Sequence, residues 1–116
     1  MLKVIYTKYS PPISDFEIYK FVDMFINEYE KSKETNPSNN FSVFVSNVLA
    51  MDVFGLRVLE DKISHDDIEF YFENEKLEFD PCLGILDPEN KIGIYSDIAD
   101  KAIKLGYEKM NKMRGR

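Results

Sequence analysis

Carboxylates and a tyrosine crowd a short stretch in the second half of this chain. The residues there whose types could do chemistry are Asp66, Asp67, Glu69, Tyr71, Glu73, Glu75 and Glu78. Paired carboxylates can hold a divalent cation or act as general acid and base. A tyrosine next to carboxylates suits a binding surface, because it buries area while keeping a polar tip. Both kinds of chemistry stay open on these residues alone.

Other catalytic and metal-binding patterns are missing from the sequence. The only histidine, His65, lies seventeen positions before the only cysteine, Cys82, so no zinc spacing and no base beside a nucleophile occur. His65-Asp66-Asp67 could bind a hard cation, but a solvated turn or a helix cap explains the same residues. The five glycines are scattered and form no phosphate-binding loop. We therefore expect no catalytic residue, no metal site and no cofactor.

Charge is distributed unevenly along the chain, whose formal net charge is −6. Residues 60–89 hold eleven acids against two lysines, a net charge of −9, whereas residues 101–116 hold six basic residues against Glu108, a net charge of +5. An acidic surface repels nucleic acid and anionic membranes and speeds association with a cationic protein. A solvated face that attracts the basic C-terminal helix of the same molecule would give the same pattern.

Length and composition are typical of one globular domain. Of the 116 residues, 44% are hydrophobic and 31% charged, which is enough apolar material to fold without disulfides. The N-terminal residues do not resemble a secretory signal peptide, and no apolar run approaches the roughly 20 residues that span a bilayer. We therefore expect a cytoplasmic protein with no membrane partner.

Alternating residues predict a sheet. Residues 2–7 indicate a first strand. The strand must end before the prolines at 11–12, because proline cannot donate a ladder hydrogen bond. In residues 68–73 and 77–80 the apolar side chains alternate with acidic ones, which predicts a β-hairpin with one buried and one acidic face. A second hairpin is predicted from residues 83–86 and 91–95, joined by a turn at 87–90.

Three main helices are predicted, at about 14–33, 41–54 and 97–113. The first begins with the capping box Ser14-Asp15-Phe16-Glu17, in which the Ser14 hydroxyl would accept a hydrogen bond from the amide of Glu17. The second is the most apolar segment and should be the central buried helix, because the run is too long for a typical strand. The third starts with acids and ends with bases, which complements the helix dipole. Residues 56–63 fit a helix or a strand.

These elements predict an α+β fold in a single domain that covers residues 1–116. Runs of strands beside runs of helices indicate a mostly antiparallel sheet of about four to five strands. The three helices should pack largely on one face of that sheet.

The lack of catalytic parts, the small size and the acidic hairpin favour a binding protein over an enzyme. Our hypothesis is a non-enzymatic inhibitor of the immunity-protein type, whose acidic hairpin face neutralises a basic toxin. A nuclease is a natural target, because it must present positive charge to its substrate and an acidic inhibitor can occupy that surface. The seven residues 66–78 named first would contact this partner, and no direct contact with nucleic acid is expected.

Three other hypotheses stay open. The chain could be a phage or mobile-element anti-defence protein that imitates nucleic-acid charge with regularly spaced carboxylates. It could be a small carboxylate-dependent metal enzyme that binds a divalent cation at the same acids. It could also be a homodimer that pairs through a sheet edge or an apolar helix face, so that a monomer and a homodimer are both compatible with the sequence.

Overall fold

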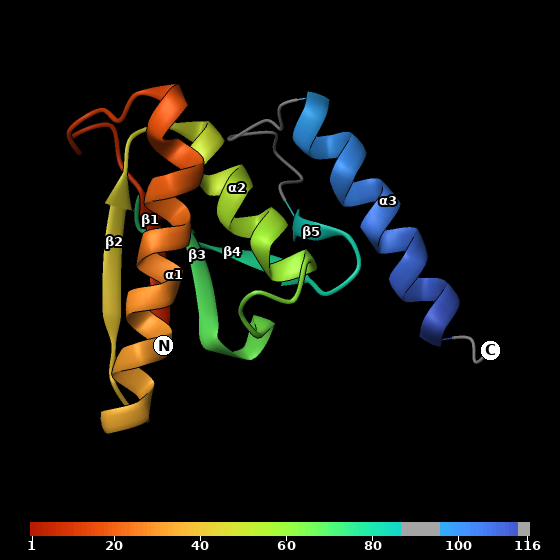
Figure 1. The fold of residues 1–116 in the computed structure, drawn as a ribbon. Helices are drawn as coiled ribbons and strands as arrows, with labels where there is room; N and C mark the ends of the chain where they lie inside the picture. The colour runs from red at the N-terminus through yellow and green to blue at the C-terminus, as the bar shows by residue number, and fades with distance from the viewer. Residues whose placement is uncertain (87–95, 114–116) are drawn as a thin grey trace.

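The fold combines one β-sheet with three helices, which confirms the predicted α+β class. The computed structural model describes residues 1–86 and 96–113. In chain order the elements are β1 (Leu2–Tyr6), the 3-10 turn η1 (Asp15–Glu17), α1 (Ile18–Thr35), β2 (Phe41–Val45), α2 (Val48–Leu59), the 3-10 turn η2 (His65–Asp67), β3 (Ile68–Phe72), β4 (Glu75–Asp80), β5 (Gly84–Leu86) and α3 (Ser96–Met113). Figure 1 shows α1 and α2 in front of the sheet, with α3 on the far side of α2 from α1.

The sheet is mixed, with strand order β2-β1-β3-β4-β5. Its strand β1 pairs in parallel with β2 on one side and with β3 on the other. Strands β4 and β5 continue the sheet beyond β3 as antiparallel neighbours. Two of these four pairings are therefore parallel, which is more than the sequence predicted, and the two parallel connections pass through α1 and α2.

The two parallel crossovers differ in hand. The chain leaves β1 for β2 on one side and then passes back across β1 to reach β3, while both connecting helices lie on the same face of the sheet (Figure 1). A crossover that reverses its direction without changing face must reverse its handedness, so one of the two is left-handed, which is uncommon. This topology places α1 and α2 together on one face and leaves the opposite face without a covering helix from either connection.

The segment 41–45, predicted as the start of a helix, forms strand β2 instead. Val43 and Val45 are buried whereas Ser42 and Phe44 are exposed, which is the alternation of a strand. All five residues of β2 pair in register with β1. The helix prediction was wrong here because one apolar segment contains both a strand and the start of a helix. Counted over the whole segment, its apolar residues recur at roughly helical spacing, which hides the alternation at 41–45.

Helix α2 begins after Asn47 and is the central buried helix that the sequence predicted. The Asn47 side-chain oxygen accepts a hydrogen bond from the amide of Leu49 at 2.7 Å, which caps the helix. Most of the helix is buried, including the large side chain of Phe54. The ambiguous segment 56–63 continues α2 as far as Leu59 and then turns.

Helix α1 and the turn η1 together match the first predicted helix, although the cap differs from the predicted box. The Ser14 hydroxyl accepts from the amide of Phe16 at 3.3 Å, and the amide of Glu17 donates to the Ser14 carbonyl instead. The tighter 3-10 turn at this end brings the earlier amide within reach of the hydroxyl. The buried residues Ile18, Val22, Ile26 and Tyr29 recur along one side of α1 and join the core.

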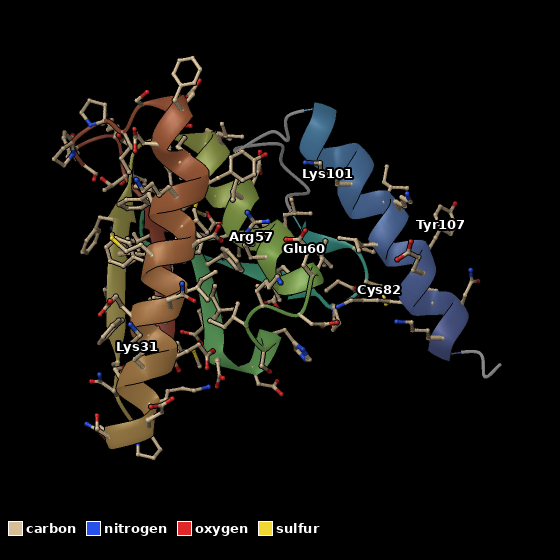
Figure 2. The ribbon with its side chains drawn as sticks, viewed as in Figure 1. Lys31, Arg57, Glu60, Cys82, Lys101 and Tyr107 are labelled. Carbon is tan, nitrogen blue, oxygen red and sulfur yellow. The ribbon has the colours of Figure 1, made fainter. Side chains whose placement is uncertain are left out.

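A polar cluster joins α1, α2 and α3 at the helix layer. The guanidinium of Arg57 donates to Asp23 at 2.7 Å and to Glu60 at 2.6 Å, and its side chain is 16% exposed. Burial alone would lower the pKa of Arg57, but these hydrogen bonds raise it above its ordinary value. Arg57 and Lys101 both lie over the ring of Tyr19, and Figure 2 shows Arg57 of α2 beside Glu60, the residue that follows the helix.

Helix α3 packs closely against the loop between β4 and β5. A Cβ atom added to Gly106 would lie 2.2 Å from the carbonyl oxygen of Cys82, so only glycine allows this approach. The predicted helix 97–113 is confirmed. Residues 84–86 of the second predicted hairpin form β5, whereas its turn at 87–90 and its strand at 91–95 lie outside the described residues. In the described part of the chain, no helix is both long and apolar enough to cross a membrane.

Candidate partner-binding surface

The sheet face turned away from α1 and α2 carries several of the predicted site residues. Residues paired across neighbouring strands point to the same face, so the register aligns Phe44, Ile5, Tyr71 and Lys76 in one row. The neighbouring row continues the alternation by two residues along each strand. We call this surface the open face and define it by Lys3, Ile5, Ser42, Phe44, Glu69, Tyr71, Lys76 and Glu78.

Glu69 is the best-anchored carboxylate on the open face. Lys76 Nζ donates to Glu69 Oε2 at 3.0 Å, and the Tyr71 hydroxyl donates to Glu69 Oε1 at 3.1 Å. The hydrogen bond from Lys76, assisted by that from Tyr71, lowers the pKa of Glu69 although partial burial opposes the shift. The same contact raises the pKa of Lys76. The amine of Lys3 lies 6.0 Å from the centre of the Tyr71 ring. Tyr71 therefore has a lysine amine near its ring and a carboxylate at its hydroxyl.

Glu78 and Glu73 form no ion pair with the described residues, although the backbone amide of Lys8 donates to Glu73 Oε1 at 3.4 Å. Glu78 is exposed on β4, on the same face as Lys76. Glu73 occupies the turn between β3 and β4 with a left-handed φ of 54°. Its backbone amide donates to the carbonyl of Tyr6 at 2.8 Å, which holds the turn at the end of β1. The exposed Glu78 is therefore accessible to a cationic partner, whereas Glu73 is partly buried and holds the Lys8 amide with one oxygen.

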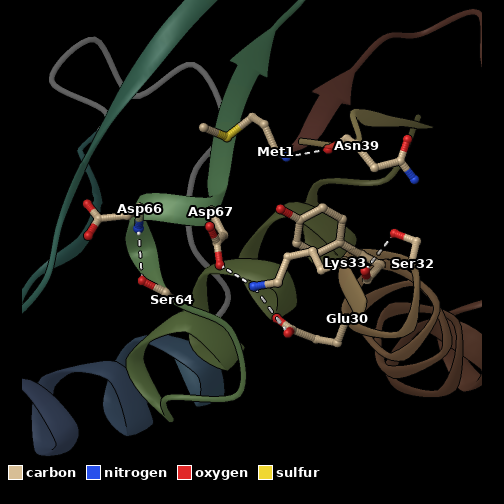
Figure 3. A network of polar contacts seen from close by, with 9 residues as sticks. Met1, Glu30, Ser32, Lys33, Asn39, Ser64, Asp66 and Asp67 are labelled. Atoms are coloured by element: carbon tan, nitrogen blue, oxygen red, sulfur yellow. Dashed lines mark hydrogen bonds and ion pairs between the residues drawn. The ribbon is translucent and has the colours of Figure 1, made fainter. Parts of the chain in front are cut away.

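Asp67 is already neutralised within the molecule and lies away from the open face. Lys33 of α1 donates to Asp67 Oδ2 at 2.6 Å and forms a second ion pair with Glu30 at 3.3 Å (Figure 3). The hydrogen bond to Asp67 raises the pKa of Lys33, although burial opposes the shift. This contact joins η2 to α1 and serves the fold.

Asp66 and Glu75 are also separate from the open face. Asp66 projects into solvent from η2. The cap of this turn is Ser64, whose hydroxyl accepts a hydrogen bond from the backbone amide of Asp66 at 3.2 Å (Figure 3). Glu75 pairs with Phe72, so its side chain points to the side of the sheet that the helices cover. The structure thus brings Glu69, Tyr71 and Glu78 together, places Glu73 at their edge, and separates Asp66, Asp67 and Glu75 from them.

Five residues of the open face were missed in the sequence: Lys3, Ile5, Ser42, Phe44 and Lys76. Phe44 was assigned to a buried helix, yet its side chain is 54% exposed. Lys3 and Ile5 received no role because the sequence does not say which strand lies beside the hairpin. The alternation of residues 41–45, taken as a strand, would have predicted the exposure of Phe44.

A cleft of about 260 Å³ lies elsewhere, beside the end of α2 and helix α3. His65, Ser64 and Pro81 contribute to its walls, and the charges of Lys109 and Asp61 pair with each other at 3.1 Å. No group of three or more histidine, cysteine or acidic side chains that could hold a metal ion gathers within residues 1–86 and 96–113.

Comparisons of the chain with protein-family models, with curated proteins and with solved structures give no match.

Proposed function

We propose that this protein is a non-enzymatic inhibitor of the immunity-protein type, whose open face binds and neutralises a basic toxin, with nuclease toxins as the target class. The observation that carries the proposal is the position of Glu69, Tyr71 and Glu78 on one sheet face that neither α1 nor α2 covers. A rigid sheet presents these side chains without the entropy cost of ordering a loop on binding.

The open face has the composition expected of a protein-binding surface. Its row of Phe44, Ile5 and Tyr71 supplies apolar and aromatic area at the centre, and interface cores are enriched in such residues. Glu78 and Glu73 supply negative charge toward one side. In such a surface the aromatic row contributes most of the affinity, whereas the carboxylates steer the basic partner and raise its association rate.

The mixture of charges on the open face is why we prefer protein binding to imitation of nucleic acid. Lys3 and Lys76 interrupt the acids, and Lys76 neutralises Glu69. A surface that imitates the phosphate backbone would need an uninterrupted series of carboxylates.

Capture from a cell lysate, followed by comparison of two charge variants, tests the proposal. The tagged 116-residue chain should retain a basic protein at low salt and release it on a salt gradient. The variant Glu73→Lys/Glu78→Lys should lose this partner, because it reverses the charge of two carboxylates that form no ion pair with the described residues. The variant Glu28→Lys/Glu34→Lys makes the same change of charge on exposed positions of α1 and should retain it.

Glu69 is left intact in this design because a lysine there would face Lys76 and destabilise the sheet. Equal capture by both variants, or a captured protein that is not basic, would contradict the proposal. Thermal unfolding of each variant ensures that a loss of binding is not a loss of fold.

A further inference from the structure

Strand β2 lies at one end of the sheet order, so one of its two sides has no neighbouring strand among the described residues. The carbonyl of Val45 accepts a hydrogen bond from the amide of Thr7, which follows β1, at 2.8 Å. Val45 therefore directs its backbone groups toward β1, and the alternation of a strand directs those of Ser42 and Phe44 to the other side. We call these outward backbone groups of Ser42 and Phe44 the β2 edge.

Most of the β2 edge is free to form hydrogen bonds. The hydroxyl of Ser10 donates to the Phe44 carbonyl at 3.0 Å, which ties the loop after β1 to one end of the edge. That carbonyl retains a second lone pair. The amide and carbonyl of Ser42 and the amide of Phe44 form no hydrogen bond with other residues that the structure describes.

The segments outside the described ranges are joined to the opposite end of the sheet. Residues 87–95 connect Leu86 of β5 to Ser96 of α3, so their Cα path is at most about 36 Å long. The strand order puts β2 four strand spacings of about 4.8 Å from β5, and a path to β2 and back needs about 38 Å. Residues 114–116 reach about 11 Å beyond α3, which ends on the side of the molecule opposite β2 (Figure 1). Neither segment covers the β2 edge.

Strand β2 has none of the features that protect an edge strand from pairing. It contains no charged residue and no proline, and its register with β1 continues without a bulge. Residues 35–51 as a whole carry no charged side chain. Strand β5, at the other end of the strand order, has only three residues. The β2 edge is therefore the side of this sheet best suited to pairing with a further strand.

Helix α1 adds an apolar flank above the β2 edge. Tyr19 and Asp23 face α2, where both contact Arg57. Phe21 and Phe25 lie on the opposite side of the helix, because two residues rotate the direction of a side chain by about 200°. Their ring centres are 4.7 Å apart and both residues are only partly buried. Since α1 lies between α2 and the outer side of β2 (Figure 1), these two rings, the α1 flank, face the same direction as the edge.

We propose that β2 pairs antiparallel with β2 of a second copy of this chain, with Ser42 opposite Phe44 of the other copy. Each copy then supplies the donors and acceptors that the other's outward groups lack. The twofold axis passes beside Val43 and brings the two α1 flanks together above the joined sheet. Strand pairing alone buries little apolar area, whereas a stable association takes roughly 1,200–2,000 Å², so Phe21 and Phe25 supply the apolar part of the contact.

The charges favour a second copy over an extended segment of a basic protein. A basic segment would find no acid within residues 35–51, and Glu28 borders the α1 flank only at the next turn after Phe25. Two copies that each carry a net charge of −6 repel each other, and this repulsion is weakest where the contact itself is uncharged. A second copy also pairs flank with flank, whereas a single extended strand brings no helix.

The pairing goes beyond the proposed function and does not depend on it. The side chains of Glu69, Tyr71 and Glu78 remain outside the contact, because they lie on strands beyond β1. The open faces of the two copies would lie side by side on one continuous sheet. A dimer would therefore carry two copies of the proposed toxin-binding surface.

Sedimentation of the full chain from micromolar concentrations to about 1 mM tests the pairing. We expect a reversible equilibrium between monomer and dimer. Raising the salt concentration to about 1 M should not weaken the dimer, because salt screens only the repulsion between two acidic copies. A chain that stays monomeric throughout, or a dimer that salt dissociates, would overturn the proposal.

Ser42→Pro tests the edge directly. The substitution removes an outward amide and leaves the hydrogen bonds to β1 in place, since proline is tolerated where the amide faces away from the sheet. The dissociation constant of the dimer should rise by about tenfold or more. Ser42→Thr keeps the amide and is the matched control, which should associate as the wild type does. Equal association of both variants, with thermal unfolding showing that both are folded, would overturn the assignment.

Hydrogen exchange of the wild type reads the same contact without a substitution. The amides of Ser42 and Phe44 should exchange rapidly in dilute solution and slowly in the dimer, whereas the amide of Val43, which faces β1, should be protected in both. A dimer in which the amides of Ser42 and Phe44 stay unprotected would contradict the pairing. Protection that appears only when the captured basic protein is added would also contradict it and assign the edge to a strand of that protein.

Discussion

At the scale of single residues, Glu69 links the stability of the hairpin to the open face. Its carboxylate accepts hydrogen bonds from Lys76 on the neighbouring strand and from Tyr71 two residues along its own strand. Both donors therefore hold fixed positions on the surface that we propose for binding. The same contacts lower the pKa of Glu69, so the folded state favours the ionised carboxylate more than the unfolded state does.

Replacement of Glu69 by glutamine should reduce the loss of stability in acid. A carboxyl whose pKa is lowered in the folded state contributes stability in full above its ordinary pKa of 4.5, and this contribution is lost as the pH falls through the lowered value. Urea unfolding from neutral to acidic pH measures the effect. The wild type should lose stability more steeply below pH 4.5 than Glu69→Gln does.

The exposed Glu78 provides the control for this pH profile. Glu78→Gln removes one carboxylate from the same sheet face but keeps both hydrogen bonds to Glu69, so it separates the loss of a charge from the loss of this contact. Profiles that are identical for the wild type and Glu69→Gln would show that the contact with Lys76 does not contribute to stability.

At the scale of elements, strand β2 decides which side chains reach the open face. Val45 is fully buried, whereas its neighbour Phe44 is 54% exposed on the other side of the strand. If the segment were a helix, as its apolar composition suggests, both side chains could lie in the core. The orientation of β2 is therefore open to a direct mutational test.

We expect Val45→Ala to cost about 2 kcal/mol of unfolding free energy, because it removes buried methyl groups and leaves a cavity. Phe44→Ala should cost less than about 1 kcal/mol, although it removes far more atoms, since the ring lies mostly in solvent. Chemical denaturation of both variants gives the comparison. A larger loss for Phe44→Ala would place Phe44 in the core and contradict the strand.

Sequence patterns predicted those elements whose signals are local. The first strand, the hairpin of β3 and β4, helix α1 and helix α3 all follow from alternation, helical spacing and capping residues. The boundary between β2 and α2 was missed, although Asn47 caps the helix there. One apolar segment contains both the two-residue alternation of a strand and the spacing of a helix, so the two could not be separated. The order of the strands could not be predicted, since β1 meets β3 only through pairing across more than sixty residues.

The candidate site was predicted in part for the same reason. Glu69, Tyr71 and Glu78 share a face because alternation along the hairpin places them there. Asp67 was counted as a surface acid because the sequence does not show that Lys33 of α1 reaches it. Phe44, Ile5 and Lys3 join the surface only through the pairing of β1 and β2 with the hairpin.

At the scale of the whole molecule, the arrangement of helices leaves opposite charges on different surfaces. Both crossover helices lie on one face of the sheet, so the acidic hairpin remains open on the other, while the basic α3 lies at the outer side of α2. A molecule with a net charge of −6 attracts cationic proteins over a distance of about a Debye length.

A neutralisation titration decides whether the open face inhibits a basic toxin. The basic protein captured on the open face is assayed for its toxic or nuclease activity while the wild-type chain is added in increasing amounts. We predict that activity falls to its end point at a fixed molar ratio, and that Glu73→Lys/Glu78→Lys leaves it unchanged at the same ratio. Activity that persists at an excess of the wild-type chain, or that falls equally with the variant, would contradict an inhibitor that acts through its open face.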